Sequence, residues 1–133
     1  MFSNEVYWLS VVILFTSVMW VPYIINRMIE MGLWPALYNP QPDTRPRAQW
    51  AERMMRAHEN AVENLVIFAP LVLLVQITHA QSSLTAMAAE YYFYARLSHF
   101  IAFSLAIPLL RVFAFLAGFA AQMVLVYEIL TVA

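Results

Sequence analysis

The sequence predicts an all-α integral membrane protein whose protomer is a single four-helix bundle over residues 1–133. The first reason is composition: 63% of the residues are hydrophobic and only 11% are charged, too few polar side chains to cover a soluble domain of this size. The second is the presence of four apolar stretches, each long enough as a helix to cross a hydrocarbon core of about 30 Å. The third is that the connections after the first are short, which predicts antiparallel neighbours in up-down-up-down order.

The four expected helices cover residues 5–31, 49–78, 84–107 and 108–131. The first begins with Glu5 instead of a basic cluster, which is typical of a retained membrane span and not of a cleaved signal peptide. Three prolines between positions 40 and 46 forbid a continuous helix in the connection that follows. Pro108 fits the first turn of the last helix, where a missing N–H removes no intrahelical bond.

All seven basic residues are arginines, and their distribution predicts the orientation of the chain in the membrane. Five lie in the first connection and the helix ends beside it, one lies beside the third connection, and the second connection has none. Because basic residues are enriched in loops that stay on the cytoplasmic side, we expect the first and third connections to be cytoplasmic. Both termini are then expected on the opposite side.

Polar residues at helical spacing mark one face of the second span. Arg56, Asn60 and Glu63 are four and three residues apart, so they stack on one side of the helix. Arg96 and His99 repeat the three-residue spacing in the third span. An ionisable group inside a membrane helix costs about 2.5–3.5 kcal/mol on insertion scales, so these groups must meet one another or a ligand.

Two interpretations of this polar set remain open from the residues alone. In the structural one, Arg56 and Glu63 form a buried ion pair, Asn60 bonds a neighbouring helix, and His99 donates to a carbonyl. In the functional one, an excess of two positive charges binds a carboxylate or a thiolate, because guanidinium groups suit such anions. The charges counted are Arg27, Arg56, Arg96, Arg111, Glu59 and Glu63.

Composition also excludes several kinds of site. The chain has no cysteine, which rules out disulfides, a protein thiol nucleophile and thiolate metal sites. Its net charge of −1 gives no basic footprint for nucleic acid. No metal site is expected, since His58 and His79 lack metal-ligand spacing with His99. Membrane lipids are the partners that the composition predicts.

Three motifs in the chain resemble the MAPEG family, the membrane-associated proteins in eicosanoid and glutathione metabolism. They are "RAHENAVENLVIFAPLVLL" in the second span, "ARLSHFIAF" in the third and "PLLRVFAFLAG" in the fourth. The order of elements is also similar, with one helix and a polar loop before the three motif-bearing helices. The resemblance implies a four-helix protomer that assembles as a homotrimer, with glutathione as cosubstrate bound between neighbouring subunits near the cytoplasmic side.

The resemblance also implies roles for individual residues. The positions that correspond to glutathione contacts are Arg27, Arg56, Asn60, Glu63, Arg96 and His99. Guanidinium groups would hold the ligand's carboxylates, Glu63 would accept from its amino group, and Asn60 would offer its amide to the peptide. Arg111 matches the arginine that lies beside the sulfur in family enzymes and favours the thiolate, so it is the expected catalytic residue. The thiolate would attack an apolar electrophile or hydroperoxide delivered through the bilayer.

Three positions depart from the family pattern. Phe103 and Phe115 stand where several members carry tyrosine, and Glu59 stands where a prostaglandin synthase of the family has arginine. A second function therefore stays open: a noncatalytic membrane subunit whose polar cluster is structural, or binds lipid headgroups or a protein partner. The arginine set favours a transferase or peroxidase, and the two missing hydroxyl groups favour the noncatalytic subunit.

Overall fold

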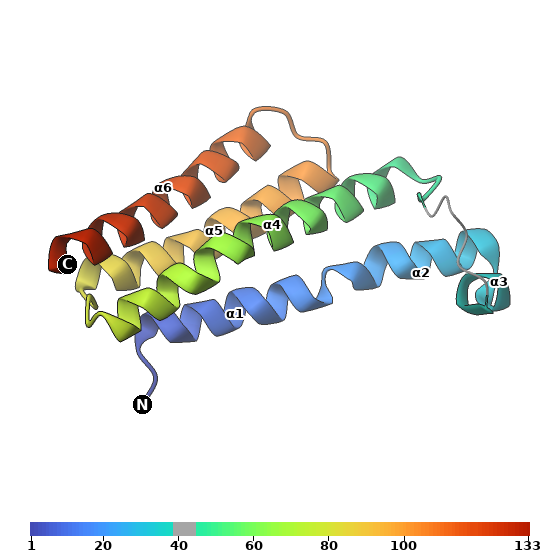
Figure 1. Cartoon of the computed structure of the whole chain (residues 1–133). Coiled ribbons are helices and arrows are strands. Elements are labelled where there is room, and N and C mark those ends of the chain that lie inside the picture. The colour runs from blue at the N-terminus through green and yellow to red at the C-terminus, as the bar shows by residue number, and fades with distance from the viewer. Residues whose placement is uncertain (39–44) are drawn as a thin grey trace.

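The structure, a computed structural model, describes residues 1–38 and 45–133, which are helical and contain no strand. The helices are α1 (Asn4–Val18), α2 (Trp20–Met31), α3 (Leu33–Tyr38), α4 (Gln49–Ile77), α5 (Ser83–Ser104) and α6 (Leu110–Val132). Figure 1 shows α1 and α2 end to end with a break between them, while α4, α5 and α6 run along the bundle in alternating directions. Most of the proline-rich part of the first connection, positions 39–44, lies outside the described residues.

Three helical stretches are long and apolar enough to cross a membrane, namely Asn4–Met31, Gln49–Ile77 and Leu110–Val132. This confirms the prediction of an all-α membrane protein. The α5 helix is not among the three, and it carries Arg96 and His99, both buried inside the protein. It lies at the centre of the bundle, where it contacts α1, α4 and α6.

The first span consists of two helices, although we expected one over residues 5–31. The break falls at Met19, between α1 and α2. Pro22 contributes to it, because proline has no N–H to bond the carbonyl four residues earlier. A contact from α4 supports the bend: the Tyr23 hydroxyl, just after the break, lies 2.8 Å from His58 Nδ1.

The turn between α5 and α6 also differs from expectation. The α5 helix ends at Ser104 and α6 begins at Leu110, so Pro108 precedes the last helix and does not occupy its first turn. Leu109 has a φ of 57°, a left-handed conformation that a right-handed helix cannot contain, so the helix starts after it. Arg53 of α4 closes the end of α5, because its Nε donates to the Ser104 carbonyl at 3.0 Å.

The core lies where α4 and α6 pack against α5. Phe68 of α4 and Tyr92 of α5 are fully buried and stack with their ring centroids 3.7 Å apart. Gly118 lets the α6 backbone approach this pair: a methyl group added there would lie 3.8 Å from the Tyr92 ring and 3.6 Å from Arg96 Cδ. The core continues toward α1 through Leu9, Val12, Val72, Val75, Ala89 and Leu125.

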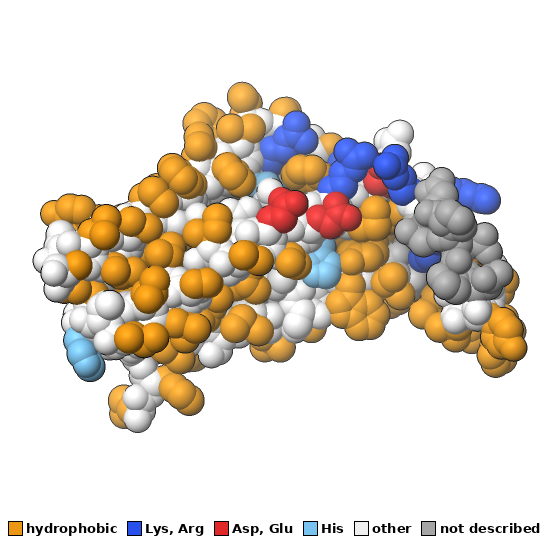
Figure 2. Space-filling view, in the orientation of Figure 1, with side chains coloured by type: hydrophobic (Ala, Val, Ile, Leu, Met, Phe, Trp, Pro, Cys, Tyr) orange, Lys and Arg blue, Asp and Glu red, His pale blue; other side chains and the backbone are white. Residues whose placement is uncertain are grey.

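Hydrogen bonds between side chains tie α5 to its neighbours at the end of the bundle that holds both termini. Thr85 of α5 donates to the buried Glu5 of α1, and Ser82, which caps α5, donates to Glu128 of α6 at 2.7 Å. The arginines gather toward the opposite end, and Figure 2 shows them over the right half of the molecule, next to two acidic patches. The basic side chains therefore lie toward the end of the bundle opposite both termini.

Candidate functional site

The polar stripe of α4 lies on the outer surface of the protomer. Arg56, Glu59 and Glu63 are exposed, and Asn60 is half-buried among them. Arg56 donates to Glu52, one turn earlier on the same helix, at 2.9 Å, and 55% of the Arg56 side chain is exposed. The buried pair between Arg56 and Glu63, which the structural interpretation required, therefore does not form.

Two adjoining cavities follow this stripe, and we call them together the α4 groove. The larger one, of about 460 Å³, is lined by Arg45, Glu52, Met55, Arg56, Glu59, Asn60, Glu63 and Phe103. The smaller one, of about 320 Å³, is lined by Gln49, Glu52, Arg53, Arg56, Phe103 and Arg111. Both volumes lie in the range of small-molecule sites, and both cavities share Glu52, Arg56 and Phe103. The groove thus brings side chains from α4, α5 and α6 to one place.

Arg111 enters the groove from the first turn of α6. Its guanidinium carbon lies 5.4 Å from the centre of the Phe103 ring, a cation–π distance. The Phe103 ring also lies 5.6 Å from the His99 imidazole, and the Phe115 ring lies 6.2 Å from the same imidazole. The two phenylalanines thus surround His99 with apolar rings at positions where a tyrosine would have added a hydroxyl donor.

Arg96 and His99 lie behind the groove, inside the bundle, with 2% and 4% of their surfaces exposed. Arg96 NH2 donates to Asn60 Oδ1 at 2.7 Å and lies 3.4 Å from His99 Nδ1. Within residues 1–38 and 45–133, Arg96 Nε and NH1 have no hydrogen-bond partner, and no carboxylate lies within ion-pair distance of this guanidinium. Arg96 therefore reaches the groove through Asn60.

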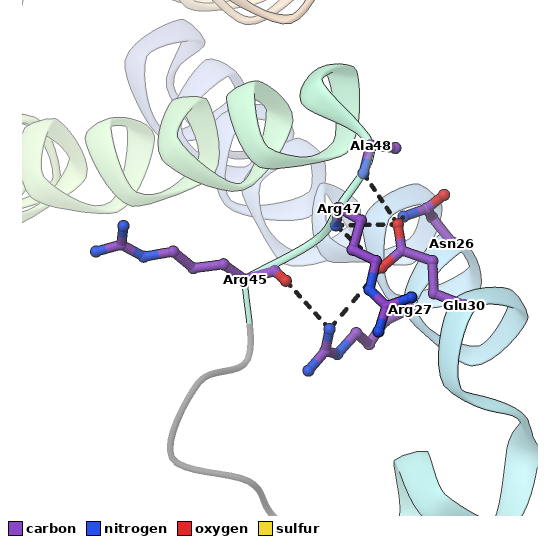
Figure 3. Close-up of polar contacts among 6 residues, drawn as sticks. All are labelled: Asn26, Arg27, Glu30, Arg45, Arg47 and Ala48. Atoms are coloured by element: carbon purple, nitrogen blue, oxygen red, sulfur yellow. Dashed lines mark hydrogen bonds and ion pairs between the residues drawn. The ribbon is translucent and has the colours of Figure 1, made fainter.

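Arg27 stands apart from the stripe, near the end of α2. Its NH1 donates to the Arg45 carbonyl at 3.1 Å and lies 3.8 Å from Glu30 Oε2, as Figure 3 shows. Glu30 accepts from the backbone N–H groups of Arg47 and Ala48, each at 3.0 Å, and so ties the end of α2 to the start of α4. Among the described residues, Arg27 contacts the groove through the backbone carbonyl of Arg45, which lines the larger cavity.

Sequence reasoning gave no binding role to several residues of the groove, namely Arg45, Gln49, Glu52, Arg53 and Met55. Glu52 lines both cavities and pairs with Arg56, and the four-residue spacing of this pair was a visible signal. Arg53 lines the smaller cavity while it bonds the Ser104 carbonyl, 51 residues away in the sequence. No short sequence pattern predicts a contact between residues so far apart in the sequence.

The largest of the cavities described lies elsewhere and has a different character. It measures about 560 Å³, lies between α5 and α6, and is lined mostly by apolar side chains such as Met87, Ala95, Phe113 and Ala117. It offers no charged group to a polar ligand. The α4 groove is therefore the candidate site, because only there do cations, carboxylates and an amide meet among the cavities described.

Comparison with known proteins supports the resemblance seen in the motifs. The MAPEG family model matches residues 6–131, nearly the whole chain, and this range includes every residue of the α4 groove. No curated protein sequence matches the chain. Members of the family commonly use glutathione, and the family contains glutathione transferases and peroxidases as well as noncatalytic members. With this match and its three membrane-capable helices, the chain belongs to the MAPEG family and is an integral membrane protein.

Proposed function

We propose that the protein is a membrane glutathione transferase or peroxidase that acts on apolar electrophiles. The observation that carries the proposal is the α4 groove, a polar cavity of small-molecule size on a helix that is otherwise apolar enough to cross a membrane. Glutathione has two carboxylates, an amino group, two peptide groups and a thiol. Arg56 offers a cation to a carboxylate, Glu63 an acceptor to the amino group, and Asn60 an amide to the peptide, which together match this ligand.

Arg111 is the proposed catalytic residue. A cation near a thiol lowers the pKa of that thiol, because it favours the charged form, and Arg111 lines the end of the groove nearest α6. In a transfer reaction, the thiolate sulfur bonds the electrophilic carbon while the leaving group departs with its electron pair. In a peroxidase reaction, two glutathione thiols become a disulfide as the hydroperoxide is reduced to an alcohol and water.

The depth of the exposed carboxylates supports a homotrimer. Glu63 lies 14 residues beyond Gln49, so it stands about 21 Å along α4, and it is exposed in the single protomer. An ionised group facing lipid at such a depth is costly, so a neighbouring subunit should cover this face of α4. Family members are oligomeric. In the proposed trimer the groove lies between protomers, and the neighbour completes the glutathione site.

The proposed topology has four membrane spans in one domain. The α5 helix has 22 residues and therefore a length of about 33 Å, enough to cross the hydrocarbon core, while its Arg96 and His99 point into the protein. The arginine-bearing ends of α4 and α6 lie on the cytoplasmic side, with the groove near that side. Both termini lie on the opposite side of the membrane.

Calorimetric titration of glutathione into the detergent-purified protein tests the proposal. We expect the wild-type trimer to bind, Arg56→Ala to lose affinity, and Arg111→Ala to keep binding but lose the ultraviolet absorbance of the bound thiolate. Arg47→Ala is the matched control, because it removes an arginine at the same end of the bundle that is not among the groove residues. Absence of binding by a well-folded wild-type trimer rejects the proposal.

A noncatalytic subunit is the second candidate, and the surroundings of His99 favour it. Phe103 and Phe115 enclose the imidazole with apolar rings, and neither ring can donate a hydrogen bond to a ligand. In this alternative the groove is a contact between protomers, or it holds a lipid headgroup or a protein partner. A stable trimer whose melting temperature is unchanged by glutathione, and falls in Arg56→Ala, is the result that favours this candidate.

A further inference from the structure

Arg96 is the most deeply buried charged side chain near the α4 groove, yet it holds a residue that lines the groove. Its NH2 donates to Asn60 Oδ1 at 2.7 Å, across the contact between α5 and α4. Its aliphatic stem packs under Gly118 of α6, where an added methyl group would lie 3.6 Å from Cδ. With 2% of its surface exposed, Arg96 is enclosed by helices on three sides.

Two donors converge on the same oxygen of Asn60. Besides Arg96, the side-chain amide of Asn64 lies 3.4 Å from Asn60 Oδ1. The same Asn64 amide donates to the backbone carbonyl of Asn60 at 2.9 Å. A side-chain amide has one acceptor oxygen and one donor nitrogen, and donors around the oxygen decide which way it turns. Asn60 also lines the larger cavity of the groove. The side-chain oxygen of Asn60 is therefore bonded inside the protein. The NH2 group of Asn60 is the side-chain polar group that can bond a ligand.

We infer that Arg96 is a positioning residue, which sets the direction of the Asn60 amide and does not itself contact the ligand. This inference rests on the proposed function and deepens it, since it assigns Asn60 the role of a hydrogen-bond donor. The ligand group that Asn60 recognises is then an acceptor, a peptide carbonyl or carboxylate oxygen of glutathione. Arg96 contributes to affinity only as long as Asn60 is present.

The substitution Asn60→Asp separates the two roles. A carboxylate accepts from Arg96 at least as well as an amide does, and it gives this buried guanidinium an opposite charge. It has no N–H to offer the ligand. Asn60→Asp should therefore raise the melting temperature while it lowers glutathione affinity, whereas Asn60→Ala, which also loses the bond to Arg96, should lower both.

A double-mutant cycle on glutathione affinity is the decisive test, with Asn60→Ala, Arg96→Met and the double variant measured by calorimetry. Each single variant should lose about two- to tenfold in affinity, the range for one hydrogen bond, and the double variant should lose no more than Asn60→Ala alone. Losses that multiply in the double variant overturn the inference, because they mean that Arg96 contacts the ligand itself. Arg96→Lys should restore most of the affinity, since one donor to Asn60 Oδ1 is enough.

Melting temperatures of the same proteins distinguish this inference from the proposed function and cover the case in which Arg96→Met folds poorly. Asn60→Asp should be stabilising with Arg96 present and destabilising beside Arg96→Met, while Arg96→Lys, which keeps a cationic donor, should retain part of the stabilisation. The same change of melting temperature in both backgrounds overturns the Arg96–Asn60 link. If the wild type binds no glutathione, the proposed function fails and the ligand part of the inference fails with it, while the melting cycle still decides whether Arg96 holds Asn60.

Discussion

Replacing Phe103 by leucine tests whether an aromatic ring keeps Arg111 beside the proposed thiolate. The Arg111 guanidinium lies 5.4 Å from the ring centre, and it is exposed, so the contact is worth about 0.5–1 kcal/mol. Losing that energy reduces the time Arg111 spends in this position by about two- to fivefold. Because one pKa unit corresponds to about 1.4 kcal/mol, the pKa of the bound glutathione thiol should rise by at most about 0.4–0.7 unit in Phe103→Leu.

The assay is the ultraviolet absorbance of the bound thiolate as a function of pH. Arg111→Ala gives the full effect of the guanidinium, and Phe103→Tyr keeps the ring and should leave the thiol pKa low. Phe115→Leu is the matched control, because its ring lies 6.2 Å from His99 and makes no cation–π contact with Arg111 in the described structure. The reasoning is refuted if Phe103→Leu shifts the thiol pKa as far as Arg111→Ala does, or if Phe103→Tyr shifts it equally.

Three further predictions concern stability and orientation. Gly118→Ala should raise the free energy of unfolding by up to about 1 kcal/mol, because the new methyl group meets its nearest neighbours at 3.6–3.8 Å and alanine is the better helix former. Gly118→Leu should lower the free energy of unfolding. The packing described here is contradicted if thermal melting in detergent shows Gly118→Ala to be less stable than Gly118→Leu. Arg53→Met should lower the free energy of unfolding by about 1.5–3 kcal/mol, because the Ser104 carbonyl loses a charged donor, and an equal loss in Arg47→Met would count against that cause. The chain has no cysteine, so single cysteines placed at Arg47 and Gln81 can be labelled from outside intact cells. Gln81→Cys should react with the label, and Arg47→Cys should be protected from it. The reverse pattern means that the proposed topology is inverted.

Hydropathy was enough to predict the helical class and three of the four expected membrane-capable stretches, but proline content was not enough to predict where helices bend. Pro70 lies inside α4 without interrupting it, whereas Pro22 follows a break in the first span. Both residues remove the same backbone donor. The difference lies in tertiary contacts: His58 of α4 bonds Tyr23 beside the break, 35 residues away in the sequence, and no local pattern reports such a contact.

The candidate site shows a similar limit. Helical spacing correctly grouped Arg56, Asn60 and Glu63 on one face of α4, because that face follows from geometry alone. Whether a face points inward or outward depends on the neighbouring helices. Arg56 and Arg96 have identical chemistry, yet one side chain is 55% exposed and the other residue is 2% exposed. The same packing decided that Arg56 pairs with Glu52 and not with Glu63.

The backbone hydrogen bonds that Glu30 accepts join the end of α2 to the residues immediately before α4. Glu30 holds Ala48, the residue immediately before α4 begins, so the helix is located by a contact at its own first turn. A peptide handle or reporter spliced between Tyr38 and Arg45 should therefore leave Arg56 at the same level of the bundle.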